Sequence, residues 1–338
     1  MVMKNLLLKI FIFFFLLNFS AIYSQYTEVI NSNKPGFSES PYGVGTGVYQ
    51  LESNLFVRNT SVKPTFSRPK SFGFDMLFRT GFLLEKLELN AQVSFQRDQI
   101  AFKNIFTSTY FSTGFSKVTI GAKYLLFQQE YEDKSKETRS WKRRNAFDKK
   151  RLTPSIALYV GLNTNFVNDI YKTESISPKI GLLFQQNLST DFNLVSNFFY
   201  DKIGTNFFEY SYIVTGTYNF NDRWSTFFEN QTVVQKDQNN TNLGTGLAFL
   251  CSKNLQINTS ARYLIEGNSK GLYTSFGLSY RIDAHKDAYT DLNENGRKIK
   301  NTPISRYEKK KQGFFTRLFS VFKKKKTRKR AKRKRKRN

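Results

Sequence analysis

The chain has 338 residues, enough for one large or two ordinary domains, and its formal net charge is +27. It contains one cysteine and one histidine, which excludes an internal disulfide framework and Cys/His zinc sites and disfavours histidine-based catalysis. We therefore expect no enzyme activity, no metal and no cofactor.

The first 24 residues have the layout of a secretory signal peptide: two lysines, an apolar run over residues 10–17, and then small residues. That apolar run is too short for a transmembrane helix, which needs about 20 residues. Residues 1–24 are therefore predicted to be an export signal that is cleaved near Ser24–Gln25.

Repeated proline and glycine mark the next segment, residues 25–45, and argue against a helix or a strand interior there. From Val48 the sequence changes to alternation, with Tyr49 and Leu51 on one side and Gln50 on the other. We expect a stiff lead-in that turns sharply just before the first strand.

Residues 46–282 repeat one pattern, in which segments of about a dozen residues alternate apolar with polar or small side chains and then break at polar clusters. Twelve strands are predicted, an even number that puts both ends of the sheet on one side. Their ranges are 46–58, 71–82, 86–96, 115–127, 153–166, 175–187, 192–203, 207–220, 223–235, 241–252, 254–266 and 270–282.

The segments are too long for a soluble β-sandwich, whose strands average about 5–6 residues, and suit tilted strands that cross a bilayer in about 9–11. Their apolar face is rich in Phe, Tyr and Leu, with aromatic residues near the segment ends, as in interfacial girdles. The opposite face is too polar for a dry core. The predicted fold class is all-β: a transmembrane antiparallel β-barrel of about 12 strands in the outer membrane of a Gram-negative bacterium, contacting lipid outside.

Connection lengths predict the orientation of this barrel, because periplasmic turns are short and external loops are longer. This places both termini in the periplasm. A charged periplasmic insertion breaks the rule and is interpreted as solvated, with a small appendage or an inward plug as alternatives. The predicted short turns lie near 84–86, 188–191, 221–222 and 252–254, the external loops at 59–70 and 98–112, and the insertion at 129–150.

Alternation also places charged side chains on the lumen face, and two interpretations remain open. They could form a pore constriction that filters solutes, or they could pair across strands and fill a narrow barrel. The candidate lumen residues are Glu52, Asp75, Arg79, Glu88, Lys123, Lys179, Glu209, Glu229, Arg262 and Arg281.

Glu39 is a further candidate pore residue, because it lies between Pro35 and Pro41 in the stiff segment. We expect this segment to lie in the periplasm or to enter the lumen. In the lumen, the Glu39 carboxylate would pair with one of the lumen arginines Arg79, Arg262 or Arg281. The alternative is a solvated linker residue.

The carboxy-terminal tail, residues 283–338, holds 22 Lys/Arg and 5 Asp/Glu, so the basicity belongs mainly to the tail. Residues 313–322 have apolar side chains at helical spacing and precede a polybasic run. This combination is typical of interfacial binding to anionic surfaces. We expect a periplasmic arm with an anionic envelope component as its partner and, because the chain is exported, no nucleic acid.

The proline-flanked stretch carries a family pattern. Lys34 is followed by Pro35, Gly36, Phe37, Ser38, Glu39, Ser40 and Pro41, and then by Gln-Leu-Glu at 50–52. This resembles the amino-terminal pattern of an outer-membrane β-barrel transporter family linked to the meta-cleavage (MetA) pathway of phenol degradation, whose members more usually have Arg where this chain has Lys34. The resemblance implies an outer-membrane protein that passes hydrophobic or aromatic compounds.

The predicted function is therefore that of a channel, in which small hydrophobic or aromatic solutes pass by passive diffusion. The lumen would strip part of the hydration of the solute, and paired charges would exclude large ions. The alternative is a structural barrel whose polybasic arm tethers the outer membrane to an anionic envelope component.

Overall fold

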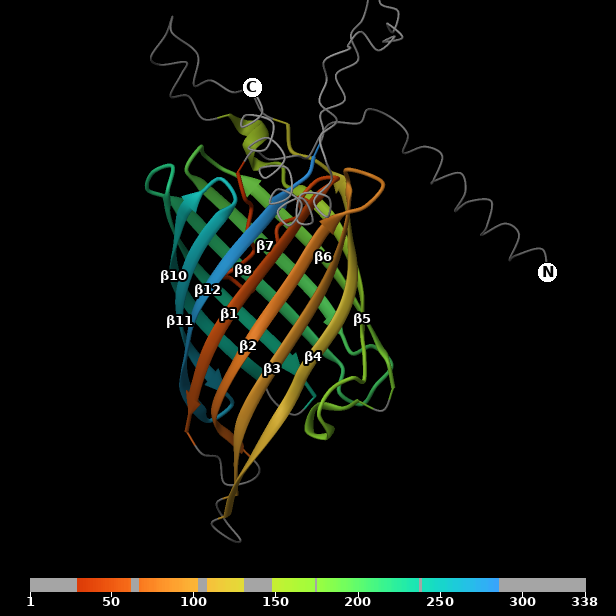
Figure 1. The fold of residues 1–338 in the computed structure, drawn as a ribbon, viewed down its shortest axis with the longest axis vertical. Helices are drawn as coiled ribbons and strands as arrows, with labels where there is room; N and C mark the ends of the chain where they lie inside the picture. Colours follow the sequence, from red (N-terminus) through yellow and green to blue (C-terminus); the bar gives the residue numbers. More distant parts are fainter. Residues whose placement is uncertain are drawn as a thin grey trace, which may run out of the picture. The chain divides into compact units, whose positions relative to one another are not determined.

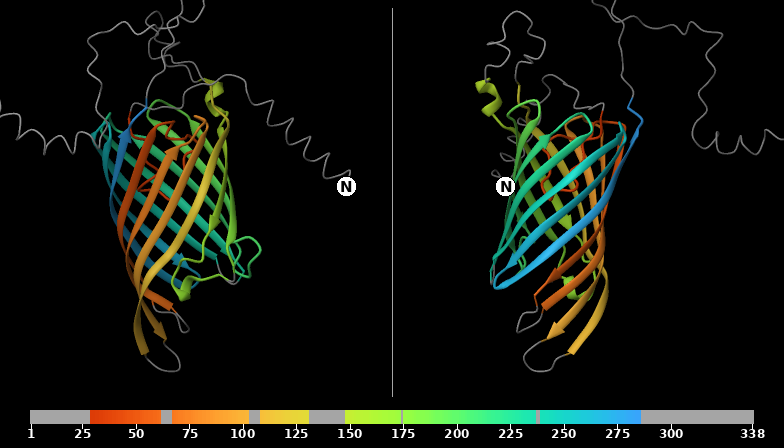
Figure 2. Two further views of the ribbon diagram at one scale, coloured as in Figure 1. Left: turned by 45° about the vertical axis from the view of Figure 1, so that its right-hand side comes forward. Right: turned by 90° about the vertical axis from the view of Figure 1, so that its left-hand side faces the viewer.

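The computed structural model describes residues 29–61, 67–102, 108–130, 148–173, 175–236 and 239–285. In this part of the chain twelve antiparallel strands form a closed barrel, in which consecutive strands are neighbours and β1 pairs with β12 (Figure 1). The predicted fold class is confirmed. Figure 2 shows from two further sides how strongly the strands tilt.

The predicted strands correspond closely to the observed ones, and most of their ends agree within two or three residues. The observed strands are β1 (Val48–Thr60), β2 (Ser67–Gly81), β3 (Leu87–Phe102), β4 (Ser108–Phe127), β5 (Ser155–Asn163), β6 (Ser177–Asn187), β7 (Phe192–Asp201), β8 (Glu209–Asn219), β9 (Trp224–Gln235), β10 (Asn239–Ser252), β11 (Leu255–Glu266) and β12 (Ser269–Asp283). In the described ranges two short 3₁₀ helices, η2 (Lys149–Leu152) and η3 (Asp169–Tyr171), lie in connections.

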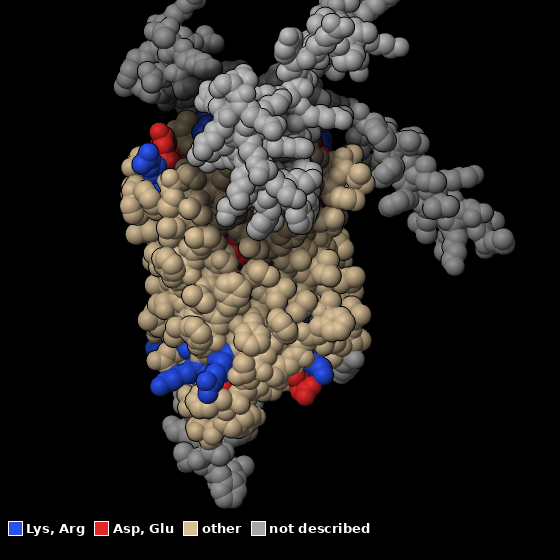
Figure 3. All heavy atoms as spheres, in the orientation of Figure 1, with Lys and Arg blue, Asp and Glu red and all other residues tan. Residues whose placement is uncertain are grey.

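The outer face of the barrel is an apolar belt. Every strand exposes at least one large apolar side chain, such as Phe74 on β2 and Phe276 on β12. In the face drawn in Figure 3, charged side chains gather toward the two ends and are sparse between them. Because a bilayer core offers no hydrogen bonds, a closed barrel with such a belt satisfies its backbone internally and suits a membrane.

The two ends of the barrel differ in the connections that they carry. We call the end with the turns 82–86, 188–191, 220–223 and 253–254 the terminal rim, because the chain enters β1 and leaves β12 there. The opposite end is the distal rim. The 129–150 insertion belongs to the terminal rim, since it connects β4 with β5, but residues 131–147 lie outside the described residues.

The predicted long loops at 59–70 and 98–112 are wrong in extent, because strands continue through half of the first range and most of the second. β3 reaches Phe102 and β4 begins at Ser108. In the second range the reason is a β-bulge: Ser94 pairs with Lys117 and Phe95 with Phe115, which leaves Ser116 as an extra residue. A bulge shifts the in–out alternation by one residue, so β4 does not have one continuous alternating pattern.

Residues 29–47 precede β1 and enter the lumen; we call them the lumenal segment. Its return to the wall uses two glycines with positive φ, Gly45 (82°) and Gly47 (74°), which suits a sharp turn. Thr46 then forms an isolated bridge to Gly81 at the end of β2. The expected sharp turn before the first strand is therefore present, and the segment folds back into the barrel.

No helix within the described ranges is long and apolar enough to cross a bilayer. The predicted export signal, residues 1–24, lies outside the described residues. So does the basic tail beyond residue 285, including its predicted helix 313–322.

A methyl group at Gly81 should disturb the entry of the lumenal segment. A Cβ atom there would lie 2.0 Å from the Gly45 carbonyl oxygen, a backbone atom that cannot rotate away. We expect Gly81→Ala to destabilise the barrel by about 1–3 kcal/mol, the usual cost of overpacking. Gly216→Ala is the matched control, because its Cβ would meet only Phe192 ring carbons at 3.4 Å. Equal melting temperatures for the two variants in a heat-dependent gel-mobility assay would contradict this expectation.

Candidate functional site

The lumenal segment is a loop whose two ends are fixed at the terminal rim. At its start the Ile30 amide donates to the Lys253 carbonyl, at 2.9 Å. At its end the Ala284 amide donates to the Gly47 carbonyl at 3.0 Å, and His285 Nδ1 lies 2.8 Å from the Thr46 carbonyl oxygen. Between these ends the segment contacts side chains in the middle of the wall strands, so it crosses the lumen.

Wall carboxylates accept hydrogen bonds from the backbone of the segment. Glu229 on β9 accepts from the amides of Phe37 (2.9 and 3.1 Å) and Ser38 (3.1 Å). Glu52 on β1 accepts from the Lys34 amide at 2.9 Å, and Glu88 on β3 accepts from the Val44 amide at 3.0 Å. Buried amides need acceptors, and in this irregular segment the wall supplies them.

Wall cations donate hydrogen bonds to the backbone carbonyl groups of the segment. Arg79 donates to the Asn31 carbonyl at 2.9 Å. Lys123 donates to the carbonyls of Ser40 and Tyr42, at 2.9 and 3.0 Å. Arg262 donates to the Pro35 carbonyl at 2.7 Å. The segment is therefore held from opposite sides of the barrel by side chains of both charges.

The same wall charges also pair with one another. Arg79 lies between Glu52 (3.0 Å) and Glu88 (2.9 Å), and Lys123 lies 3.0 Å from Glu88. These four side chains are at most 1% exposed. A lone buried charge is costly, whereas a paired and hydrogen-bonded one is tolerated, so the network leaves none of them isolated.

A second buried pair, Arg262 with Glu229 at 3.1 Å, holds the deepest part of the segment. The two residues stand on β11 and β9, and Gly244 of β10 is in register between them. A Cβ atom at Gly244 would come within 2.9 Å of the Arg262 side chain, so the glycine leaves room for Arg262 to cross β10. The guanidinium also lies 3.7 Å from the centre of the Phe37 ring, in cation–π contact.

The expected ion pair of Glu39 with Arg79, Arg262 or Arg281 is wrong. Arg79 and Arg262 are occupied by wall carboxylates, as described above, and Arg281 lies 3.7 Å from Asp283. Glu39 nevertheless lies in the lumen, where its backbone amide and carbonyl both pair with the Asn197 side chain at 2.8 Å. Its carboxylate Oε2 is buried and has no hydrogen-bond partner.

The remaining candidate residues lie on the distal side of the segment. Lys179 is 3.8 Å from Asp201, and Glu209 is 3.3 Å from Lys202. Asp75 faces the hydroxyl group of Tyr273. The structure therefore divides the predicted lumen charges into a set that holds the segment and a set that lines a space beyond it.

Sequence reasoning missed the uncharged side chains that hold the segment. They include Asn197, Gln185, which accepts from Ser40 Oγ at 2.7 Å, and Ser279, whose Oγ is 2.7 Å from Ser32 Oγ. Their only signal was a position on the polar face of a strand, which they share with many solvated residues. No group of three His, Cys, Asp or Glu side chains suited to a metal occurs among the residues that the structure describes.

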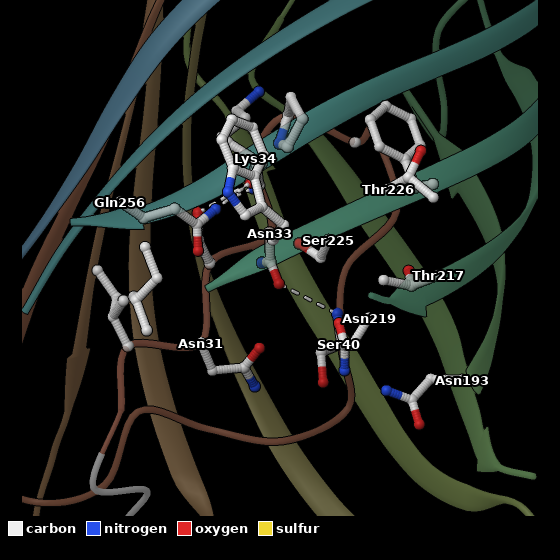
Figure 4. A pocket seen from close by; sticks show the side chains of 18 of the residues that line it. Asn31, Asn33, Lys34, Ser40, Asn193, Thr217, Asn219, Ser225, Thr226 and Gln256 are labelled. Atoms are coloured by element: carbon white, nitrogen blue, oxygen red, sulfur yellow. Dashed lines mark hydrogen bonds between the residues drawn. The ribbon is translucent and has the colours of Figure 1, made fainter. Parts of the chain in front are cut away.

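Two cavities flank the segment. The terminal vestibule, about 500 Å³, opens between the segment and the wall from β6 to β11 and is lined largely by uncharged polar side chains such as Asn193, Thr217 and Asn219 (Figure 4). The distal vestibule, about 370 Å³, lies toward the other rim. Asn33, Lys34, Gly36 and Ser38 border both cavities, so residues 33–38 form a septum between them.

The closed barrel, the apolar belt and the occupied lumen define an outer-membrane type of β-barrel with an internal plug. Residues 32–282 match the family model described as "Putative MetA-pathway of phenol degradation", and the chain belongs to that family. The match includes the septum, in agreement with the resemblance seen at Pro35–Pro41. No curated protein matches the sequence.

Solved structures of similar architecture include three outer-membrane channels. The COG4313 outer membrane channel from Pseudomonas putida F1 has 9% identity and a TM-score of 0.48, covering 75% of this chain and 100% of that one. The CymD monoaromatic hydrocarbon channel has 8% identity and a TM-score of 0.41, covering 71% and 90%. The KdgM porin in complex with disordered oligogalacturonate has 10% identity and a TM-score of 0.44, covering 68% of this chain and 98% of that one. Such low values carry no conclusion about the solute of this chain.

Loss of the Glu229 charge should destabilise the plugged barrel strongly. In Glu229→Gln, Arg262 loses its carboxylate and the amides of Phe37 and Ser38 lose a charged acceptor. We expect a loss of about 3–5 kcal/mol in the free energy of unfolding, as for other broken buried pairs.

Glu266→Gln is the matched control, because it breaks an Arg–Glu pair with Arg58 whose side chains are about a fifth exposed (20% and 18%). Because water reaches this pair and screens it, we expect a smaller loss in the free energy of unfolding than in Glu229→Gln. The comparison is made by urea titration of both variants in lipid vesicles. Similar losses in the free energy of unfolding for Glu229→Gln and Glu266→Gln would show that Glu229 does not hold the segment.

Proposed function

We propose that this chain is a passive channel in the outer membrane of a Gram-negative bacterium, closed in the described state by the septum at residues 33–38. The observation that carries the proposal is the septum itself, a four-residue border shared by two cavities that otherwise occupy the lumen from either rim. A barrel that served only as an anchor would need no such internal division.

The way in which the segment is held suits a movable plug. Its contacts with the wall are mostly hydrogen bonds to side chains, and the bridge from Thr46 to Gly81 is the one isolated β-bridge in the described ranges. The segment therefore adds no strand to the barrel. It can leave the lumen while the twelve-stranded ladder stays intact.

Phe37 supports small hydrophobic or aromatic molecules as the solutes. Its ring packs against two apolar clusters of the lumen wall, one around Tyr159 and Phe199 and the other around Phe56 and Tyr273. Withdrawal of Phe37 would leave two apolar surfaces facing each other across the lumen. The family description, which names phenol degradation, agrees with an aromatic solute.

The proposed topology has the terminal rim in the periplasm, after export and removal of residues 1–24. The barrel then occupies residues 46–282, residues 25–45 enter it, and residues 283–338 form a periplasmic arm. The proposal assigns no catalysis. No observation in the described part of the chain favours the alternative in which the arm tethers the envelope, and an anionic partner for the arm stays a prediction.

A disulfide between the segment and the wall should lock the channel closed. Ser32 and Ser279 have hydroxyl oxygens only 2.7 Å apart, close to the roughly 2 Å length of an S–S bond. We expect Ser32→Cys/Ser279→Cys, on a Cys251→Ser background, to show no large conductance steps in planar bilayers when oxidised and to regain them with a reductant. Deletion of residues 29–45 should give a permanently larger conductance.

Ser32→Cys alone, on the same background, is the control for effects of the reductant. If the oxidised double variant conducts like the reduced one, the septum does not gate the pore and the proposal is wrong.

A further inference from the structure

The distal vestibule contains an unusual balance of charges. It is bordered by the septum and by strands on several sides of the barrel, and its volume of about 370 Å³ falls within the range of about 300–1,000 Å³ typical of small-molecule sites. Both ionised and apolar side chains face it.

Most of the ionised groups around the vestibule are paired. Lys179 is 3.8 Å from Asp201 and has its ammonium 4.3 Å from the centre of the Phe199 ring. Glu209 accepts from Lys202 and from Gln235, at 3.3 and 2.8 Å. Asp75, as noted, faces the Tyr273 hydroxyl, and the Lys34 ammonium lies 5.9 Å from the centre of the Phe37 ring.

Apart from the Lys34 ammonium, which has only the Phe37 ring as a partner, two groups that line the vestibule remain, and they have opposite charges. The Lys117 ammonium makes no hydrogen bond or ion pair with any residue that the structure describes, and the same holds for the Glu39 carboxylate. They come from different parts of the fold. The bulge at Ser116 directs Lys117 of β4 inward, and the Asn197 clamp fixes Glu39 on the lumenal segment.

The vestibule also offers an apolar surface beside these charges. Phe37, Leu77, Phe199 and Ile213 all line it. A molecule that enters can therefore place an apolar body against these side chains and keep its polar end toward Lys117 and Glu39.

We propose that the distal vestibule binds a small zwitterion with an apolar body, such as an aromatic or aliphatic α-amino acid. The carboxylate of the ligand pairs with the Lys117 ammonium, and the ammonium group of the ligand pairs with the Glu39 carboxylate. A zwitterion supplies a partner for each unpaired group and leaves the net charge of the vestibule unchanged. A simple anion would face Lys117 but also the carboxylate of Glu39.

This inference concerns binding to the closed state and does not depend on whether the septum opens. Titration calorimetry on the full chain in detergent tests it with four ligands of nearly the same shape: phenylalanine, 3-phenylpropionate, 2-phenylethylamine and 3-phenylpropanamide. Phenylalanine carries both charges, 3-phenylpropionate only the negative charge, 2-phenylethylamine only the positive charge, and 3-phenylpropanamide no charge. We expect phenylalanine to bind at least about tenfold more tightly than each of the others, the effect of one charge-assisted hydrogen bond.

Two variants assign the charges of the ligand to their partners. In Lys117→Met, phenylalanine should bind no more tightly than 2-phenylethylamine, because the carboxylate has lost its partner. In Glu39→Gln, phenylalanine should bind no more tightly than 3-phenylpropionate. Lys172→Met, in the connection after β5, removes an exposed lysine and should change nothing.

The ligand series on the unaltered chain decides the matter even if a variant does not fold. Equal affinities for all four ligands, no binding of phenylalanine, or an affinity for either singly charged ligand that matches that of phenylalanine would overturn the proposal. A failed conductance test would leave this result untouched, because the calorimetry measures no flux.

Discussion

Buried backbone groups of an irregular segment must find hydrogen-bond partners, and the rest of the lumen is arranged around this requirement. The lumenal segment forms no ladder, so its amides depend on wall acceptors such as Glu52 and Glu229. Each of these buried carboxylates in turn needs a cation, which Arg79 and Arg262 provide. Each of these arginines also donates one hydrogen bond to a segment carbonyl, Arg79 to Asn31 and Arg262 to Pro35. The lumenal segment and the wall thus supply hydrogen-bond partners to each other.

These hydrogen bonds between the lumenal segment and the paired wall charges explain why the lumen charges have different roles at different depths. Around the septum they are paired and hydrogen-bonded to the backbone, as the interpretation of cross-strand pairing requires. Beyond the septum, Lys117 and Glu39 face open space. Charges of this second kind are available to a solute in the distal vestibule. The terminal vestibule is lined mainly by amides and hydroxyls, with Asp191, Asp222 and Arg223 exposed at its rim.

The period-two pattern predicted the strands, their number and the lumen side of the candidate wall charges, because a strand buried in lipid on one face must alternate. It did not identify Lys117, which also faces the lumen. It failed between β3 and β4, where Ser116 shifts the phase. It also could not pair residues across the lumen. Glu39 was assigned to an arginine, but the arginines are satisfied by Glu52, Glu88 and Glu229. Those pairings depend on register and depth, which no local pattern of the sequence contains.

The wall pairs also determine what opening would cost. If the lumenal segment withdrew, Arg262 would keep Glu229, and Arg79 would keep Glu52 and Glu88. No buried charge would lose its counter-ion, and the freed amides and carbonyls would exchange side-chain partners for water in a wet lumen. Each such exchange costs about 0.5–3 kcal/mol, depending on whether a charged group takes part. A wall without internal ion pairs would instead expose single charges as the plug left. The pairing of the wall charges with one another would therefore let the lumenal segment withdraw without leaving a buried charge unpaired.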